Sequence, residues 1–278
     1  MIETPLLTQV QAFAEGILQK LPPHYSYHNY QHTSDVVATT FAIATTMDIE
    51  AKALENLLIA AWLHDIGYSQ STTDHEQIGA DMAREFLTSL EVSEKRINKI
   101  CTYILATRMP QMPMNAKEMI LCDADLAHLA DEAFWEKSES LRQEISHTKE
   151  PLAEKEWFKI TLAFFEEHRY FTPYGKSILA PKKELNKLQM EEKLSFLKES
   201  KKLKKAENDK QIKEEKIKKP ERGVETMFRT TSANHFQLSA MADNKANIMI
   251  SVNTIIISLI VSILVRKLEE NTVVLTYS

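Results

Sequence analysis

The sequence predicts an all-α protein, and three observations support this fold class. Long stretches of apolar residues follow helical rather than alternating periods. Glycine is scarce, with only five in 278 residues. The hydrophobic fraction of 44% is large enough for a sizeable core. We therefore expect helices to make up nearly all of the regular structure.

Composition and charge argue against several classes of protein. The formal net charge of −5 does not suit a nucleic-acid binder, so no nucleic-acid partner is expected. Cys101 and Cys122 do not make a disulfide framework, and we expect them to fill the core in a reducing compartment. The N-terminal stretch MIETPLLTQVQAFAEG carries two acids and no basic segment, so we do not read it as a signal peptide.

Residues 1–180 are expected to form a compact helical domain. Proline- and glycine-containing stretches such as LPPHYS, RMPQMPMN and YFTPYGK predict its loops. Thr72, Thr73 and Asp74 are good N-cap residues for the helix that follows them. The predicted helices cover residues 52–63, 75–90, 93–107, 116–130 and 151–168.

Residues 181–222 differ sharply in composition from this domain. Lys and Glu dominate the segment, and lysine exceeds the acids. We interpret it as a charged, solvated and partly helical linker. The alternative is a basic juxtamembrane segment in contact with anionic lipid. A coiled coil is a weaker alternative, because the heptads are poorly kept.

Residues 223–278 contain a candidate transmembrane helix. Twenty uncharged residues lie between Lys245 and Arg266. A helix of that length spans roughly 30 Å, the thickness of a bilayer core. A buried helix of a soluble domain is the alternative. Because basic residues are heavier on the N-terminal side, we expect the N-terminal domain in the cytoplasm, at the inner (cytoplasmic) membrane.

The same segment carries a polar stripe. Asn247, Ser251, Thr254, Ser258 and Ser262 recur every three or four residues and share one helical face. A polar stripe on a spanning helix faces another helix or water rather than lipid. We therefore expect a homo-oligomer.

The stretch WLHDIGY, residues 62–68, indicates a site that binds a cation. An apolar run, LLIAAWL, leads directly to His64 and Asp65. Burying an unpaired charge there would be costly, and a bound cation removes that cost. Gly67 follows closely and lets the chain turn away.

Further ligands are found on either side of this pair. His28 and His32 are four residues apart in YHNYQHT and share a helical face if the helix begins that early. Asp123 and Asp125 follow an apolar run in LCDADL. Imidazole and carboxylate together suit a divalent ion such as Mn, Fe, Co, Ni, Zn or Mg more than a thiolate-seeking metal. Such an ion acidifies a water molecule and polarises a phosphoryl group.

In this order, the motifs YHNYQHT, AAWLHDIGY, DHEQIGA, ILATRMP and LCDADL resemble those of the HD-domain metal-dependent phosphohydrolases. The resemblance covers roughly residues 20–170. It implies an HD-domain helical bundle that binds a divalent metal ion. It places the metal ligands at His32, His64, Asp65 and Asp125, with Asp125 preferred over Asp123.

The resemblance also implies roles for neighbouring residues. Catalytic roles are expected for Asp65, His75 and Arg108, and contact with the substrate phosphate for His28 and Arg108. A surface or capping histidine is the alternative for His28.

Two more residues have open alternatives. Glu76, together with His75, is a candidate for a second metal or a proton relay, or it simply stabilises a helix N-terminus. His128 either supports Asp125 or is a packed polar residue.

Residues 224–272 carry a second resemblance. The phrase SAMADNKANI, followed by the serine-dotted apolar run, is similar to the membrane module of the Pycsar effector family. In that family a cyclic pyrimidine nucleotide triggers membrane-embedded effectors. The family module has at least two spans, and we expect an incomplete module here.

Together these patterns predict a membrane-anchored HD-domain phosphohydrolase acting on a nucleotide or cyclic nucleotide, as an effector in Pycsar-type antiphage defence. One alternative is a non-catalytic HD domain that senses the nucleotide and gates a membrane-disrupting effector. Another is a tethered scaffold with a vestigial metal site.

Overall fold

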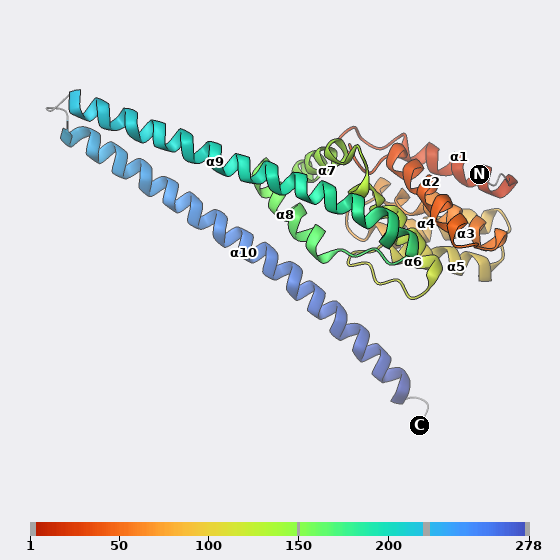
Figure 1. The fold of residues 1–278 in the computed structure, drawn as a ribbon. Helices are drawn as coiled ribbons and strands as arrows, with labels where there is room; N and C mark the ends of the chain where they lie inside the picture. Colours follow the sequence, from red (N-terminus) through yellow and green to blue (C-terminus); the bar gives the residue numbers. More distant parts are fainter. Residues whose placement is uncertain (1–3, 149–150, 219–222, 276–278) are drawn as a thin grey trace. The chain divides into compact units, whose positions relative to one another are not determined.

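The computed structural model describes residues 4–148, 151–218 and 223–275, and their regular structure is entirely helical (Figure 1). The all-α prediction is confirmed for this part of the chain. The elements are α1 (Pro5–Leu18), α2 (Tyr30–Thr46), α3 (Ala51–Leu63), η1 (Ile66–Ser69), α4 (His75–Ser89), α5 (Glu94–Ala106), α6 (Ala116–Asp125), η2 (Leu126–Ala130), α7 (Phe134–Thr148), α8 (Glu154–Glu167), η3 (Gly175–Leu179), α9 (Ala180–Lys218) and α10 (Gly223–Leu275).

The predicted helices are found within a few residues of their expected ends. The helix expected over 116–130 is divided, because α6 ends at Asp125 and a 3-10 turn, η2, continues to Ala130. Asp74 is the N-cap residue of α4, as expected, but it has φ 54° and makes no capping hydrogen bond through its side chain. Its position was therefore predicted correctly, and its capping contact was not.

The start of α2 corrects one expectation from the sequence. The side chain of Asn29 accepts hydrogen bonds from the backbone N–H groups of Gln31 (2.9 Å) and His32 (3.2 Å), which makes Asn29 the N-cap. The helix therefore begins at Tyr30, and His28 precedes it. The prediction that His28 and His32 share a helical face is wrong for this reason.

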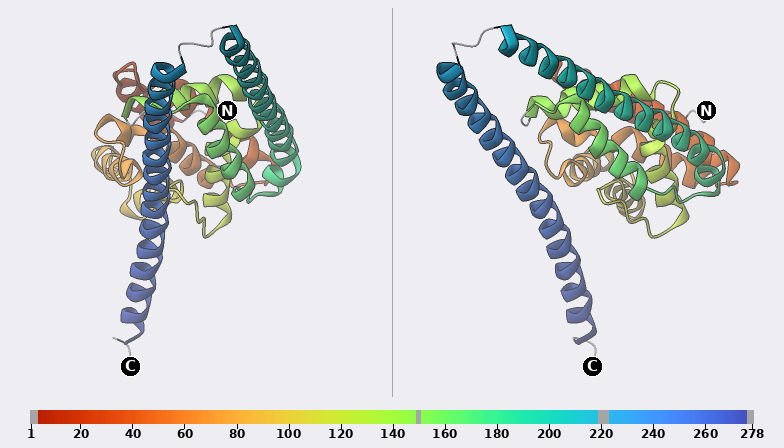
Figure 2. Two further views of the ribbon diagram at one scale, coloured as in Figure 1. Left: turned by 90° about the vertical axis from the view of Figure 1, so that its left-hand side faces the viewer. Right: turned by 60° about the vertical axis from the view of Figure 1, so that its left-hand side comes forward.

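The main core is organised around α3. This helix packs against α1, α2, α4, α5 and α6, and the gathered helices are seen in Figure 2. Leu57, Leu58, Ile59 and Leu63 of α3 are fully buried. Helix α3 therefore has apolar residues on nearly all of its faces, as expected of a helix at the centre of a bundle. Cys101 and Cys122 are both free and buried, as expected.

A second, smaller core joins α7, α8 and the beginning of α9. Phe134, Phe158 and Phe165 form it together with Met190 and Leu194 of α9. The compact unit accordingly extends to Lys201, and a second unit covers residues 202–278. The first part of the Lys/Glu-rich segment is thus a helix packed on the domain rather than a solvated linker.

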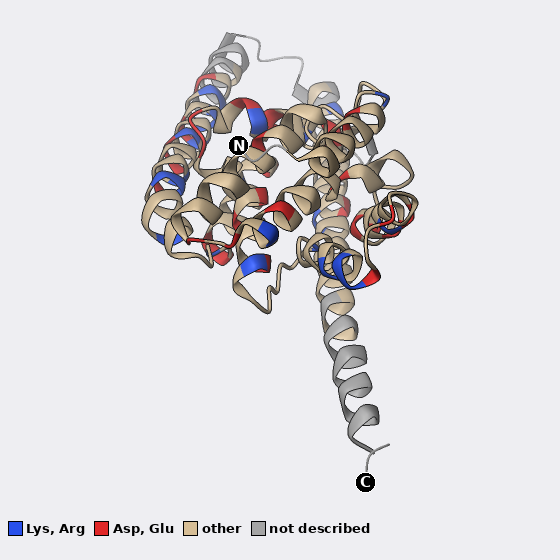
Figure 3. Cartoon of the chain, turned by 90° about the vertical axis from the view of Figure 1, so that its right-hand side faces the viewer, with Lys and Arg blue, Asp and Glu red and all other residues tan. Residues whose placement is uncertain are grey.

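The second unit contains the end of α9 and all of α10. Lys and Glu occur along the described part of α9 (Figure 3). Among the residues searched, which are those the structure describes, no helix is long and apolar enough to span a bilayer. The predicted transmembrane helix is therefore not confirmed, and its last part, including Ser262 of the polar stripe, lies outside the described side chains.

Candidate metal centre

Four side chains from three parts of the bundle converge on one point. His32 Nε2 lies 3.4 Å from Asp65 Oδ2 and 3.5 Å from Asp125 Oδ1. His64 Nε2 lies 3.1 Å from Asp65 Oδ2 and 3.6 Å from Asp125 Oδ1. Ligand atoms about 2.1 Å from a shared ion are separated by roughly 3.0 to 3.4 Å. The spacing in this cluster therefore matches that of a coordination shell.

Three of these residues have ligand atoms close enough together to hold one metal ion. The ligand atoms of His32, His64 and Asp125 all lie within 4.8 Å of one another, so these residues form a possible metal site. His32 and His64 are buried, and Asp125 is partly exposed. The site therefore has a dry interior and one accessible side.

Two buried atoms test whether this cluster fits a metal. His64 Nε2 and Asp65 Oδ2 have no hydrogen-bond partner in the structure. Buried polar atoms ordinarily have one, so each such atom requires an explanation. His64 Nδ1 lies 2.8 Å from the backbone carbonyl of Ala61, which accepts its hydrogen bond, so the neutral imidazole directs its Nε2 lone pair at the cluster. This donor set fits a divalent cation.

The turn after α3 depends on Gly67. A Cβ atom on Gly67 would overlap the carbonyl oxygen of His75 and lie 2.8 Å from the backbone nitrogen of Gly79. The glycine therefore allows α4 to pack directly on the turn that presents His64 and Asp65. No described glycine has a positive φ, so close approach is the reason for this residue rather than backbone conformation.

Opposite charges dominate the electrostatics of the metal-free cluster. Burial lowers the pKa of His32 and His64, but the two carboxylates outweigh it, so the pKa of His32 is raised and that of His64 is raised well above its usual value. Burial raises the pKa of Asp65 and Asp125, but the histidines outweigh it and hold both below their usual range. A metal must therefore displace protons from the imidazoles.

Asp123 and Asp125 face different partners. Asp123 Oδ1 accepts a hydrogen bond from the N–H of Phe171 (2.8 Å), and Oδ2 accepts from Thr172 N (2.8 Å) and Thr172 Oγ1 (2.6 Å). Burial raises the pKa of Asp123 despite these bonds. The geometry thus places Asp125 with the histidines and gives Asp123 to the loop before η3.

A stack of aromatic rings lies beside the cluster. Tyr68 is sandwiched between His28 and His75, with ring centroids 4.2 and 4.0 Å away. His28 Nδ1 is paired with Glu144, whose other oxygen accepts from the N–H groups of Tyr27 (2.8 Å) and His28 (3.0 Å). Glu144 was not identified from the sequence, since it is 116 positions from His28 and no local pattern connects them.

His75 and Arg108 lie outside the four-residue cluster. His75 Nε2 is 3.7 Å from Asp65 Oδ1, on the side of that carboxylate away from His64, and 3.5 Å from Glu76 Oε1. Arg108 is about half exposed, and its guanidinium faces Asp74 (3.3 Å) and Glu76 (3.9 Å). His75 is thus close enough to Asp65 to act with it, whereas the guanidinium of Arg108 pairs with Asp74 and Glu76 rather than with the cluster.

Two further residues support Asp125. His128 Nδ1 lies 3.2 Å from the backbone carbonyl of Asp125 rather than its carboxylate. Burial, with His32 nearby, lowers the pKa of His128 to about 4. Gln111 Nε2 donates a hydrogen bond to Asp125 Oδ2 (3.1 Å). No local sequence pattern indicates this contact.

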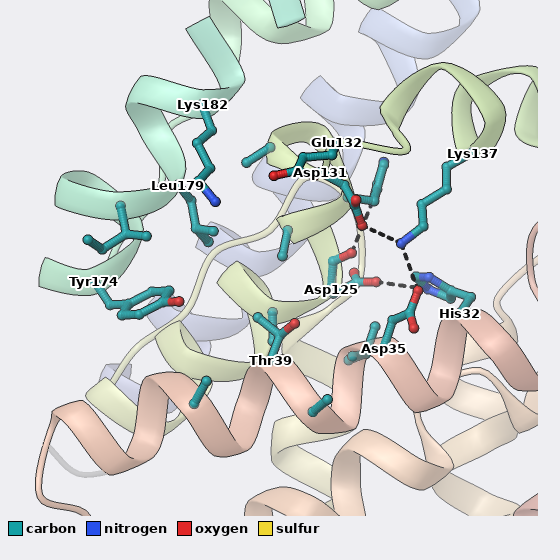
Figure 4. A pocket seen from close by; sticks show the side chains of 18 residues that line it. His32, Asp35, Thr39, Asp125, Asp131, Glu132, Lys137, Tyr174, Leu179 and Lys182 are labelled. Atoms are coloured by element: carbon teal, nitrogen blue, oxygen red, sulfur yellow. Dashed lines mark hydrogen bonds and ion pairs between the residues drawn. The ribbon is translucent and has the colours of Figure 1, made fainter. Parts of the chain in front are cut away.

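A cavity of about 410 Å³ opens beside the centre. Figure 4 shows His32 and Asp125 on one side of it, with Tyr174 and Lys182 on the other. The accessible side of the centre therefore leads into this open cavity.

Comparison with known proteins agrees with this geometry. Residues 29–130 match the family described as the HD domain, and this range includes all four clustered residues. No curated protein matches the chain. The match does not extend to residues 223–278, and nothing in these comparisons supports a Pycsar membrane module.

Two solved structures are similar over most of their own length. A protein from Lactobacillus plantarum has a TM-score of 0.53 and 17% identity, with 73% of this chain and 100% of that chain covered. A predicted HD superfamily hydrolase from an uncultured Thermotogales bacterium has a TM-score of 0.42 and 19% identity, with 73% and 93% covered. At this identity the first of them supports a shared fold only.

Proposed function

We propose that this chain, whose residues 29–130 match the HD domain, is a metal-dependent phosphohydrolase. The main support is that His64 Nε2 and Asp65 Oδ2 are buried without a hydrogen-bond partner, while Asp65 Oδ2 faces His32 and His64 Nε2 faces Asp125. Four protein ligands leave coordination positions free for other groups, as a catalytic site needs. We assign His32, His64, Asp65 and Asp125 as the ligands.

A divalent ion held there supplies positive charge that polarises a phosphoryl group and acidifies a water molecule. Imidazole and carboxylate donors suit Mn, Fe, Co, Ni, Zn or Mg. In the reaction, water attacks phosphorus, the ester P–O bond breaks, and the alcohol leaves with a proton.

The residues around the centre have separate roles in this proposal. Asp65 Oδ2 faces the cluster, and Asp65 Oδ1 faces His75. Asp65 and His75 are therefore placed to hold the proton of the attacking water. His28 is held by Glu144 and Tyr68 at the edge of the centre, where an imidazole suits contact with a phosphate oxygen. Arg108 is exposed and reaches the phosphate only by leaving Asp74.

We also propose the ligand of the chain, its oligomeric state and its location. The ligand is a nucleotide or cyclic nucleotide, and the chain works as a homo-oligomer at the cytoplasmic membrane, as an effector in Pycsar-type defence. Their support is the sequence resemblance and the composition of residues 223–278.

Adjacent carboxylates provide a matched test of the activity. The full chain is stripped of metal, reloaded with Mn²⁺ and incubated with nucleotides that include cCMP and cUMP. Asp125→Asn should lower phosphate-ester cleavage by about a hundredfold or more, because it removes a ligand. Asp123→Asn, assayed below its melting temperature, should lower cleavage far less, because Asp123 faces Phe171 and Thr172 rather than the metal ligands.

The outcomes separate the proposed enzyme from its alternative. Retained cleavage in Asp125→Asn would contradict the assignment of Asp125 as the ligand. Metal binding without cleavage of any compound would contradict the proposed activity and favour a domain that senses its ligand.

A further inference from the structure

The cavity beside the metal centre has the size of a small-ligand site. Its volume of about 410 Å³ lies near the lower end of the roughly 300–1,000 Å³ typical of ligand pockets. His32, Asp125 and His128 form the side that it shares with the centre. Small side chains leave the space open, namely Ala38, Ala42, Ala124, Ala127 and Ala130.

The opposite wall comes from a part of the chain outside the family match. Tyr174, Ile178 and Leu179 line the cavity from the π-helix η3 and the residue before it, and Lys182 lines it from α9 (Figure 4). The family match ends at residue 130. This wall of the cavity is therefore contributed by residues beyond the matched domain.

Asp123 fixes that wall to the metal centre. Its carboxylate binds Phe171 and Thr172, just before η3, while Asp125 faces the histidines. Thr172 Oγ1 in turn accepts from the N–H of Gly175 (2.9 Å). The cavity wall and the candidate ligand Asp125 are thus held by the same turn of α6.

The charges lining the cavity are unfavourable for a chain of phosphates. Lys137 Nζ is already paired with Asp35 (2.7 Å) and Asp131 (2.5 Å). Glu132 also lines the cavity, and Lys182 is the other lysine there, with no ion pair among the described residues. Carboxylates therefore outnumber lysines even before Asp125 is counted.

We infer that the substrate is a phosphate monoester whose organic group occupies this cavity, and that di- and triphosphates are poor substrates. This inference rests on the proposed phosphohydrolase activity. With a single phosphate at the metal, the rest of the substrate meets carboxylate acceptors that suit hydroxyl and amino donors. With a terminal phosphate at the metal, further phosphates would lie beside Asp131 and Glu132, where like charges repel.

The first test compares AMP, ADP and ATP with the Mn²⁺-loaded full chain. We expect kcat/KM for AMP to exceed that for ATP by about tenfold or more. p-Nitrophenyl phosphate reports the activity independently of the phosphate count. Its cleavage, together with equal kcat/KM for AMP and ATP, would overturn the inference and leave the proposed function standing. Cleavage of cCMP or cUMP but of none of these four compounds would overturn the inference and leave the proposed function standing. Failure to cleave all six compounds would overturn both.

A charge reversal tests whether the cavity causes the selectivity. Glu132→Lys should reduce the AMP-to-ATP ratio by about threefold or more, because it removes one repulsive charge and adds an attractive one. Glu136→Lys makes the same change on an exposed position of α7 that does not line the cavity, and should leave the ratio unchanged. Equal effects of the two variants would overturn the placement of the substrate.

A second variant tests occupancy by volume. Ala42→Leu adds bulk to the cavity wall and should raise KM for AMP by about fivefold or more. Thr45→Leu, on an exposed position of the same helix outside the cavity, should not. An unchanged KM in Ala42→Leu would overturn the inference.

Discussion

Single residues decide how the centre is built, and Gly175 illustrates this at a distance from the metal. A Cβ atom there would overlap Asp123 Oδ2 and lie 2.7 Å from Tyr170 Cβ. The absence of a side chain lets the loop before η3 approach α6 closely enough for Asp123 to bind Phe171 and Thr172.

The effects of two glycine substitutions on stability test this close approach. Gly175→Ala should destabilise the fold by about 1–3 kcal/mol, because the atoms it meets are buried and constrained. Gly16→Ala in α1 meets nothing within 4 Å and should stabilise by up to about 1 kcal/mol through helix propensity. Urea unfolding measures both. A neutral Gly175→Ala would contradict the close approach described here.

The sequence predicted the residues of the centre better than it predicted their neighbours. His32, His64, Asp65 and Asp125 follow from motifs, and the structure brings them together. The partner of Asp123 is 48 or 49 positions away, and that of His28 is 116 positions away. Contacts at such separations leave no local periodicity or spacing, so they had no signal in a single sequence.

Among the elements, α7 positions the loop that precedes α2. Ser26 Oγ donates to the backbone carbonyl of Ser140 (2.7 Å), and Glu144 accepts from the N–H groups of Tyr27 and His28. This loop carries His28 to Tyr68 and leads directly into the helix that carries His32. Helix α7 therefore acts on the centre without contributing a ligand.

Substitution of Glu144 tests whether α7 supports the loop that precedes α2. Glu144→Ala should lower the free energy of unfolding by about 2–4 kcal/mol, because it leaves buried N–H groups without an acceptor. It should also speed amide hydrogen exchange at Tyr27 and His28. Glu139→Ala on the same helix breaks a partly exposed pair with Arg142 and an exposed hydrogen bond from Gln143, and should cost less than about 1 kcal/mol. Equal costs would contradict this role of Glu144.

Element boundaries were predictable where the helical period of apolar residues is clear, as at α3, α4 and α5. The beginning of α9 was not, because Met190 and Leu194 are buried by a core that forms only in the folded chain. The helix expected to span a membrane was not found among the described residues, and the last part of its apolar run lies outside the described side chains.

For the whole molecule, the buried cluster links stability to pH and metal. Without metal, the raised pKa values of His32 and His64 contribute stability that is complete below about pH 6.5 and is lost as pH rises through those pKa values. The lowered pKa values of Asp65 and Asp125 contribute stability that is present above about pH 4 and is lost as pH falls. Metal reverses the first trend, because it binds neutral imidazole.

Thermal unfolding of the full chain tests this reversal. Between about pH 6 and pH 8.5, the contribution of the cluster to Tm should fall with pH in chelator and rise with pH in Mn²⁺. His64→Ala provides the baseline for each series, since it removes one member of the cluster. Parallel trends with and without Mn²⁺, after subtraction of that baseline, would contradict the assignment of the histidines as ligands.

The most direct measurement is X-ray diffraction at the manganese absorption edge from crystals grown with Mn²⁺. We expect an anomalous peak among His32 Nε2, His64 Nε2, Asp65 Oδ2 and Asp125 Oδ1, about 2.0–2.3 Å from each atom. A map from Mn²⁺-saturated protein with no peak at that position would contradict the metal centre and the activity proposed from it.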